Sequence, residues 1–220
     1  MPFKPISEPR VRLADKVYGQ IMQAIADGSI SARDRIVQEK LAEDFGISRT
    51  PIREALFRLE QEGILSVSGR GGFKIRIPDE GEIDELYGAR AAIEGYSARL
   101  LAEAGTPETL ARLRQEITAL EDLRDTSVRA YFEANMAIHR AFVAAAGNRF
   151  LLEQFNNIWG RGSSFALFAE IRKQSMARSL GNHTALVDAI ASGDGCLAAE
   201  KMIEHILDGR DLQRQVTSAP

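Results

Sequence analysis

Residues 41–56 read LAEDFGISRTPIREAL, and this stretch decides the fold of the front of the chain. Apolar residues at helical spacing precede a turn at positions 45–48, and a second amphipathic helix follows it. Gly46 can take the positive φ that so tight a turn requires. Ser48 is a candidate N-cap, and Pro51 falls in the first helical turn, where proline is tolerated. The stretch therefore predicts a helix–turn–helix, a motif whose second helix lies in the DNA major groove.

Further elements are predicted on either side of this motif. Apolar periodicity and glycine breaks indicate, in chain order, a helix over Val11–Asp27, a helix over Val37–Phe45, a helix that follows Ser48 and reaches Glu62, and strands over Ile64–Ser68 and Phe73–Ile77. The turn between the strands reads GRGG at positions 69–72. This glycine-rich hairpin is a candidate wing beside the helix–turn–helix.

The start of the predicted third helix carries groups that suit DNA. Arg49 and Arg53 lie one turn apart on its outward face, and a guanidinium presents a fork of donors to guanine or phosphate. Ser48 and Thr50 add hydroxyl groups where the free N–H groups of a helix start already favour phosphate. Arg70 lies in the hairpin and is available to a groove or a phosphate. The alternative is that these side chains form an ordinary solvated face.

This region resembles a known family. The run over residues 41–56, followed by RLE at 58–60 and EG at 62–63, is similar to the winged-helix motif of GntR-type transcriptional regulators. Arg33 departs from the family pattern, which usually has glycine there, and this change alters the loop or adds a phosphate contact. The resemblance implies that operator DNA is contacted by Arg35, Ser48, Arg49, Thr50, Arg53 and the wing glycines Gly71 and Gly72.

Charge is distributed unevenly along the 220 residues. The net charge of −3 by itself argues against a nucleic-acid partner. Residues 1–78, however, carry 13 basic and 10 acidic side chains, whereas residues 79–220 carry 15 and 21. A basic front end indicates a nucleic-acid partner for that end. Pro78 and the acidic residues after it mark a boundary, so we predict a DNA-binding domain over residues 1–78 and a second domain over residues 79–220.

The second domain shows no strand pattern. Amphipathic stretches predict helices over Glu82–Ala104, Pro107–Arg124, Val128–Ala146, Phe150–Phe168, Glu170–Ala191 and Cys196–Gln213, with a frayed tail from Val216. The predicted fold class is therefore mainly α, with a winged helix-turn-helix followed by an all-α antiparallel helical bundle.

All three histidines of the chain fall in this second domain, on the inward faces of predicted helices. His139 shares its face with Asn135, one turn earlier, while His183 and His205 lie among apolar residues. Neutral imidazoles bind divalent transition metals, and an amide oxygen can complete the ligand set. The alternative is three hydrogen-bonded core histidines without a metal.

The second domain also resembles a known one, the FCD ligand-binding domain, which follows the winged helix in the FadR-like branch of GntR regulators. The resemblance rests on FEANMAIHRAF at 132–142 and on a closing pattern over residues 183–206. In the family, an aspartate and three histidines bind a divalent metal, often zinc or nickel. The corresponding residues here are Asn135, His139, His183 and His205. An amide in place of a carboxylate weakens the attraction to the cation, so the metal affinity should be lower.

Arg90 falls on the apolar face of the first helix of this domain, beside Tyr87. An uncompensated cation is costly there. One interpretation is an i, i+4 ion pair with Glu94. The other, implied by related FCD regulators, is that Arg90 binds the carboxylate of an organic-acid effector in the bidentate geometry that arginine favours. Trp159 is interpreted as core or dimer packing.

Taken together, these features predict a bacterial transcriptional regulator, which we expect to be a repressor and not an enzyme. It would bind a two-fold-symmetric operator in double-stranded DNA as a homodimer and respond to a small carboxylate bound near the metal. A second hypothesis is a metal-dependent hydrolase with an accessory DNA-binding domain, in which the histidines activate water. Glu133 and Glu204 point off the ligand faces, however, and leave that hydrolase without a general base.

A third hypothesis is that the histidines are structural and the bundle only dimerises. The N-terminus has no apolar run typical of a signal peptide, no segment approaches membrane-spanning length, and Cys196 is the only cysteine. We therefore expect a cytoplasmic protein without a membrane partner.

Overall fold

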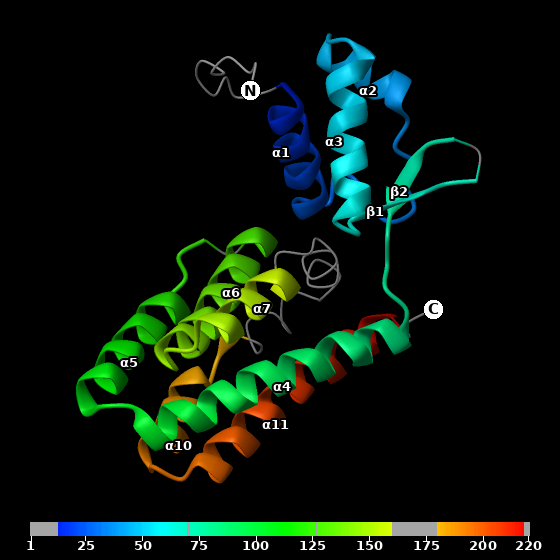
Figure 1. Ribbon diagram of the computed structural model, residues 1–220. Helices are drawn as coiled ribbons and strands as arrows, with labels where there is room; N and C mark the ends of the chain where they lie inside the picture. The colour runs from blue at the N-terminus through cyan, green and yellow to red at the C-terminus, as the bar shows by residue number, and fades with distance from the viewer. Residues whose placement is uncertain (1–12, 70, 126, 160–179, 218–220) are drawn as a thin grey trace, which may run out of the picture. The chain divides into compact units, whose positions relative to one another are not determined.

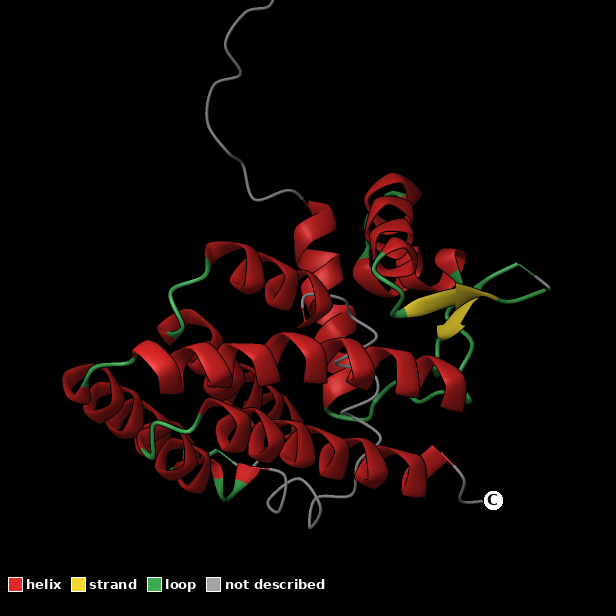
Figure 2. Cartoon of the chain, turned by 60° about the horizontal axis from the view of Figure 1, so that its bottom comes forward, coloured by secondary structure: helices red, strands yellow, loops and turns green. Residues whose placement is uncertain are grey.

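The computed structural model describes residues 13–69, 71–125, 127–159 and 180–217 (Figure 1). The chain divides into two compact units, Met1–Arg76 and Ile77–Pro220. Over the described residues, the first unit combines helices with a two-stranded sheet, and the second contains helices without strands (Figure 2). The fold class is therefore mainly α, as the sequence predicted.

The first unit follows the predicted order of elements. These are α1 (Leu13–Ala26), α2 (Gln38–Phe45), α3 (Arg49–Gln61), β1 (Leu65–Val67) and β2 (Phe73–Ile75). The two strands pair antiparallel, with Leu65 opposite Ile75. Ile36 also pairs with Phe73 through two backbone hydrogen bonds of 2.8 Å, a contact that the sequence pattern did not predict. The segment before α2 is therefore attached to the hairpin.

The core of the first unit lies between α1 and α3. The buried side chains of α3 are Ile52, Ala55, Leu56 and Leu59, which form the predicted inward face. Those of α1 are Val17, Ile21 and Ile25. Leu13, which shares this face of α1 by its spacing, is 52% exposed at the first residue of the helix. Tyr18 adds a polar connection, since its hydroxyl donates to Glu62 Oε2 at 2.6 Å.

The turn between α2 and α3 depends on Gly46. This residue ends α2 in the left-handed conformation, with φ of 63°, as the sequence predicted. Its amide donates back to carbonyl groups of the last turn of α2. A Cβ at this position would touch no neighbouring atom within 4 Å, so the cost of a larger residue is conformational rather than a steric clash.

Gly46→Ala is expected to destabilise the first unit by about 1–2 kcal/mol, because an L-residue other than glycine strains the left-handed conformation. Gly19→Ala is the matched control: Gly19 lies inside α1 with open space around it, so alanine should stabilise the helix by roughly 0.5–1 kcal/mol. Amide hydrogen exchange of the α3 core, measured in the full chain, reports both changes. Equal effects of the two substitutions would contradict the role given to Gly46.

The second unit is an α-helical bundle. Its described helices are α4 (Glu80–Ala104), α5 (Pro107–Glu121), α6 (Val128–Ala145), α7 (Arg149–Trp159), α10 (His183–Ala191) and α11 (Gly195–Thr217). The two longest, α4 and α11, lie side by side and run antiparallel (Figures 1 and 2). A continuous apolar core joins α4, α5, α6, α10 and α11, and its fully buried members include Ile83, Leu101, Ile117, Ile138, Phe142 and Met202.

Helix boundaries of the second unit differ from the prediction at several places. α5 ends at Glu121 and not at Arg124. α4 begins earlier than expected, because Asp79 and Glu82 form a capping box in which each side chain accepts from the backbone N–H of the other. Asn182 has a φ of 72°, so a helix begins at His183 instead of running continuously to Ala191 from Glu170. α11 continues to Thr217, beyond the predicted onset of fraying. The predicted helical residues 160–179 lie outside the described part of the chain.

Over the described residues, no helix combines the length and the apolar character that crossing a membrane requires.

Candidate metal centre and nucleic-acid interface

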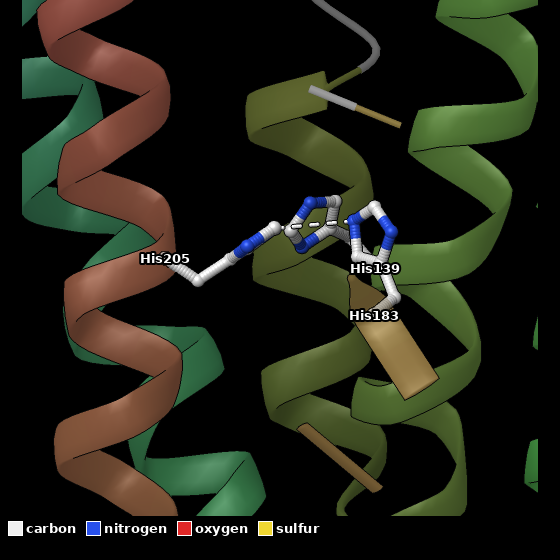
Figure 3. Close-up of side chains that lie close together, drawn as sticks. All are labelled: His139, His183 and His205. Atoms are coloured by element: carbon white, nitrogen blue, oxygen red, sulfur yellow. Dashed lines mark hydrogen bonds between the residues drawn. The ribbon is translucent and has the colours of Figure 1, made fainter. Parts of the chain in front are cut away.

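The three histidines of the chain converge at one point in the second unit (Figure 3). His139 comes from α6, His183 is the first residue of α10, and His205 comes from α11. One ring nitrogen from each lies within 4.8 Å of those of the other two. His139 and His183 are fully buried, and His205 is partly buried. The structure therefore brings together three residues that the sequence placed on separate helices.

His183 is held in a defined orientation. Its Nδ1 lies 2.9 Å from the carbonyl oxygen of Leu180 and 3.2 Å from Glu121 Oε1. Both partners are acceptors, so Nδ1 carries the proton and Nε2 keeps its lone pair. Glu121 also accepts the backbone N–H of His183 at 3.0 Å, which satisfies a free donor at the start of α10.

The Nε2 atom of His183, which keeps its lone pair, faces His205. The two Nε2 atoms are 3.1 Å apart. Two ligand atoms on a tetrahedral zinc ion, each at a bond length of about 2.0–2.1 Å, are separated by about 3.3 Å. The spacing of these nitrogens therefore fits two ligands of one metal ion.

Burial sets the protonation state of both residues. Burial, followed by the charge of His139, lowers the pKa of His183 to about 2. The same causes, in the same order, lower the pKa of His205 to about 3. Both imidazoles are therefore neutral at neutral pH, the form that binds a metal.

Asn135 lies one turn before His139 on α6 and is buried. Its Oδ1 has no hydrogen-bond partner. An unsatisfied buried acceptor costs about 1–3 kcal/mol, and a cation would remove that cost. Three imidazole nitrogens and one amide oxygen form a donor set that suits a divalent transition metal such as zinc or nickel, so the residues present fit such an ion.

Arg90 on α4 is buried next to this cluster. Its Nε donates to Glu94 Oε1 at 3.0 Å, which confirms the ion pair that the i, i+4 spacing indicated. The guanidinium carbon also lies 4.3 Å from the centre of the Trp159 ring and 4.9 Å from that of Tyr87. His139 stacks on the same tryptophan, with ring centres 5.9 Å apart. Trp159 therefore connects the arginine with the histidines, in addition to packing in the core.

Glu94 contacts both Arg90 and His139. Its second oxygen, Oε2, lies 2.5 Å from His139 Nδ1, and neither atom has another hydrogen-bond partner. Burial raises the pKa of the Glu94 carboxyl, but the charges of His139 and Arg90 outweigh it and lower the pKa to about 2. Glu94 is therefore an ionised carboxylate in the interior.

Sequence reasoning missed Glu121, Trp159 and the second contact of Glu94 as neighbours of the histidines. The spacing of Glu94 from Arg90 was available as a signal, since both lie on one face of α4. Glu121 and Trp159 reach the cluster from α5 and α7, and nothing in their local sequence indicates that contact.

The predicted DNA-contacting residues at the start of α3 are exposed. Ser48 is the N-cap of α3, but its side chain makes no capping hydrogen bond. Arg49, Thr50 and Arg53 follow it on the surface. Arg49 lies 3.5 Å from Glu39 Oε1 with 68% of its side chain exposed, and so weak a surface pair leaves the guanidinium available to a ligand. The first turn of α3 thus presents free N–H groups, hydroxyls and guanidinium groups together.

The wing residues are arranged differently. Arg35 donates to the carbonyl oxygen of Gly71 in the hairpin. Gly72 has a φ of 140°, and a Cβ there would lie 3.0 Å from both Arg35 Nε and the carbonyl oxygen of Ile36. Arg35 therefore packs against the hairpin at Gly71 and Gly72. A residue other than glycine at position 72 would crowd Arg35 and strain the backbone. Arg33 is exposed. Arg70 lies outside the described residues.

Two family models match the chain. The model of bacterial regulatory proteins of the gntR family matches residues 13–75. The FCD domain model matches residues 85–208, more than half of the chain. The chain belongs to the GntR family. Both resemblances seen in the sequence are therefore confirmed, and the protein is a transcriptional regulator with a GntR DNA-binding domain and an FCD domain.

Several regulators of transcription are similar to this chain in sequence. The HTH-type transcriptional regulator YdhC of Bacillus subtilis (strain 168) is 31% identical over 149 residues, which cover 64% of this chain and 65% of that protein. McbR of Escherichia coli (strain K12) is 28% identical over 207 residues, or 89% of this chain and 92% of McbR. The gluconate operon transcriptional repressor of Bacillus licheniformis is 24% identical over 199 residues, which cover 88% of this chain and 82% of that protein.

A solved structure agrees with the fold of this GntR regulator. The structure of E. coli McbR/YncC superposes with a TM-score of 0.60 at 23% identity, covering 94% of this chain and 99% of that one. The relatives named here are described as regulators of transcription, and the comparisons do not support the hydrolase hypothesis. Glu133 and Glu204 are exposed and pair with Arg129 and Lys201, as their positions off the ligand faces predicted.

Proposed function

We propose that this GntR regulator binds operator DNA as a homodimer through a domain over residues 1–78, and that a divalent metal and a small carboxylate in the domain over residues 79–220 control its affinity for that DNA. The observation that carries the proposal is the convergence of His139, His183 and His205, whose ligand nitrogens lie within 4.8 Å of one another. We further propose that it acts as a repressor, because one relative is described as the repressor of a gluconate operon.

The proposed operator contacts come from two places. Ser48, Arg49, Thr50 and Arg53 would contact bases and phosphates, since all are exposed at the start of α3. At the wing, Arg35, Gly71 and Gly72 would approach the backbone of the duplex, together with Arg70. The glycines allow that close approach because they carry no side chain.

The proposed metal ligands are His139, His183, His205 and the Oδ1 of Asn135. A bound divalent ion supplies a Lewis-acid site at which a carboxylate can be anchored. Arg90 is the proposed second anchor for the same carboxylate, because its Nε is used by Glu94 while a guanidinium has five donors in all. Gluconate, named in the description of one relative, is a small carboxylate of this kind.

The metal is tested on protein without a histidine tag, since the chain has only three histidines and all of them are in the cluster. We expect one zinc or nickel ion per chain by elemental analysis, and its loss in His139→Ala and in His183→Ala. Chelation of the native protein should lower its melting temperature, because a ligand bound only by the folded state stabilises it. Metal-free native protein with an unchanged melting temperature on zinc addition would mean that the histidines are structural.

The effector is tested by a thermal-shift screen of small organic acids against the metal-loaded protein. We expect an acid that raises the melting temperature also to change the affinity for an operator selected from a random duplex library, since ligand and DNA affinities are linked. An acid that binds without any change in operator affinity would refute the proposed regulation.

A further inference from the structure

Glu94 stands out among the interior groups of the second unit. It is fully buried, and it is the only carboxylate among the buried polar residues in the described part of the chain. One of its oxygens is occupied by Arg90 Nε at 3.0 Å. The other lies 2.5 Å from His139 Nδ1 and has no other partner. A side chain that served only to neutralise Arg90 would not need that second contact.

A divalent ion at the proposed metal site would need a buried negative charge near it. The imidazoles of His139, His183 and His205 and the amide of Asn135 are all neutral when they act as ligands. A divalent ion would therefore bring two positive charges into an interior that already contains Arg90. Buried charges are tolerated only when they are paired, so an anion is required beside these ligands.

We propose that Glu94 is the anionic partner of the metal centre and acts through His139. This inference rests on the metal site of the proposed function. A carboxylate at Nδ1 of a ligand histidine fixes the ring and makes its other nitrogen, Nε2, a stronger donor to the metal. Glu94 is thus a positioning residue that also places one negative charge beside the four neutral ligands.

Glu121 makes a similar but weaker contact with His183. Its carboxylate lies 3.2 Å from Nδ1, is 21% exposed, and shares that nitrogen with the carbonyl oxygen of Leu180. Loss of its charge leaves His183 Nδ1 with a backbone acceptor, whereas His139 Nδ1 has no acceptor besides Glu94 in the described part of the chain. Glu94→Gln should therefore weaken metal binding more than Glu121→Gln.

The test uses the full chain and measures zinc affinity by competition with a chromogenic chelator. Glu94→Gln is expected to weaken zinc binding by about 10–100-fold, the usual cost of removing such a partner. Glu133→Gln and Glu204→Gln are matched controls, since both carboxylates adjoin ligands in the sequence but are exposed and paired elsewhere. Both controls should bind zinc within about twofold of the native protein.

A second variant guards against loss of the fold, because Glu94→Gln leaves Arg90 buried without a counter-charge. Arg90→Met combined with Glu94→Gln removes both charges and should fold, as judged by far-UV circular dichroism and a cooperative urea transition. In this double variant we expect a smaller but measurable loss of zinc affinity, because His139 loses its carboxylate while removal of the Arg90 charge lessens repulsion of the ion. Addition of Asn135→Asp to either variant should raise its zinc affinity at least tenfold, because a carboxylate among the ligands then supplies the missing negative charge. Asn135→Asp should also raise the zinc affinity of the native protein, but by a smaller factor. A purely structural role of Glu94 predicts equal gains in the two backgrounds.

The absorption spectrum of the cobalt-loaded protein gives an independent measurement. Its ligand-field bands should shift in Glu94→Gln and not in Glu133→Gln. A folded Glu94→Gln variant that binds zinc within twofold of the native protein would overturn the inference, and so would a weakened variant in which Asn135→Asp raises zinc affinity no more than it does in the native protein. A native protein that binds no metal would instead refute the proposed function, so the two failures are distinguishable.

Discussion

Replacement of Arg49 and Arg53 by alanine is expected to weaken binding to the selected operator by about 10²–10⁴-fold, because each bidentate contact to a base contributes about 1–3 kcal/mol of discrimination. Both side chains are exposed at the start of α3, so the fold should survive their removal. The ion pair of Arg49 with Glu39, 3.5 Å long and largely exposed, contributes little stability. Fluorescence anisotropy with the selected operator and a scrambled duplex measures the change.

A charge-matched control separates specific contacts from general attraction. Arg99→Ala with Arg129→Ala removes two exposed arginines from the second unit, each paired with a glutamate four residues later. This control variant should bind the operator with an affinity within a few-fold of that of the native protein. The Arg49 and Arg53 variant should also show a smaller dependence of binding on salt if either residue contacts phosphate. Undiminished preference for the operator over the scrambled duplex in that variant would refute the proposed interface.

Acidification is expected to destabilise the metal-free second unit by on the order of 2–4 kcal/mol between pH 7 and pH 5. The pKa of His183 falls to about 2 and that of His205 to about 3 in the folded protein, from 6.5 in the unfolded chain. The unfolded state therefore binds more protons throughout this range, so stability decreases as the pH falls below 6.5. The lowered pKa of Glu94 acts in the same direction at more acidic pH, below its ordinary value of 4.5.

Urea unfolding at several pH values, followed through the single tryptophan, measures this effect. Trp159 is buried beside His139, so its emission reports on the second unit. His183→Gln should remove about half of the pH dependence, since one of the two titrating groups is then absent. A stability that is constant from pH 7 to pH 5 would show that the histidines are not kept neutral by burial.

Much of the first unit could be predicted from the sequence because its decisive features are local. The glycine turn at 46, the proline at 51 and the apolar face of α3 are all recorded within a few residues of one another. The pairing of Ile36 with Phe73 could not be predicted in the same way, because it joins segments far apart in the sequence through backbone atoms. Backbone pairing leaves no mark on side-chain periodicity.

The candidate metal centre was predictable only in part, because its contacts also join segments that are far apart in the sequence. Helical spacing placed His139, His183 and His205 on inward faces, but it gave no distance between three helices. Those distances follow from packing of the bundle, as does the contact of Glu121 with His183. The two ends of the Glu94 network illustrate the difference: its pair with Arg90 lies within one helix and follows from spacing, while its approach to His139 joins α4 to α6.

The attachment of the hairpin to the segment before α2 has a consequence for how the operator is read. Two backbone hydrogen bonds between Ile36 and Phe73, together with the contact of Arg35 with Gly71, hold the hairpin against the helical part of the first unit before any duplex arrives. We therefore expect docking of the hairpin on DNA to cost little conformational entropy, so that more of the contact energy is realised as affinity. We expect duplexes that would require a different separation between α3 and the hairpin to bind less tightly, because adjusting that separation would break these contacts.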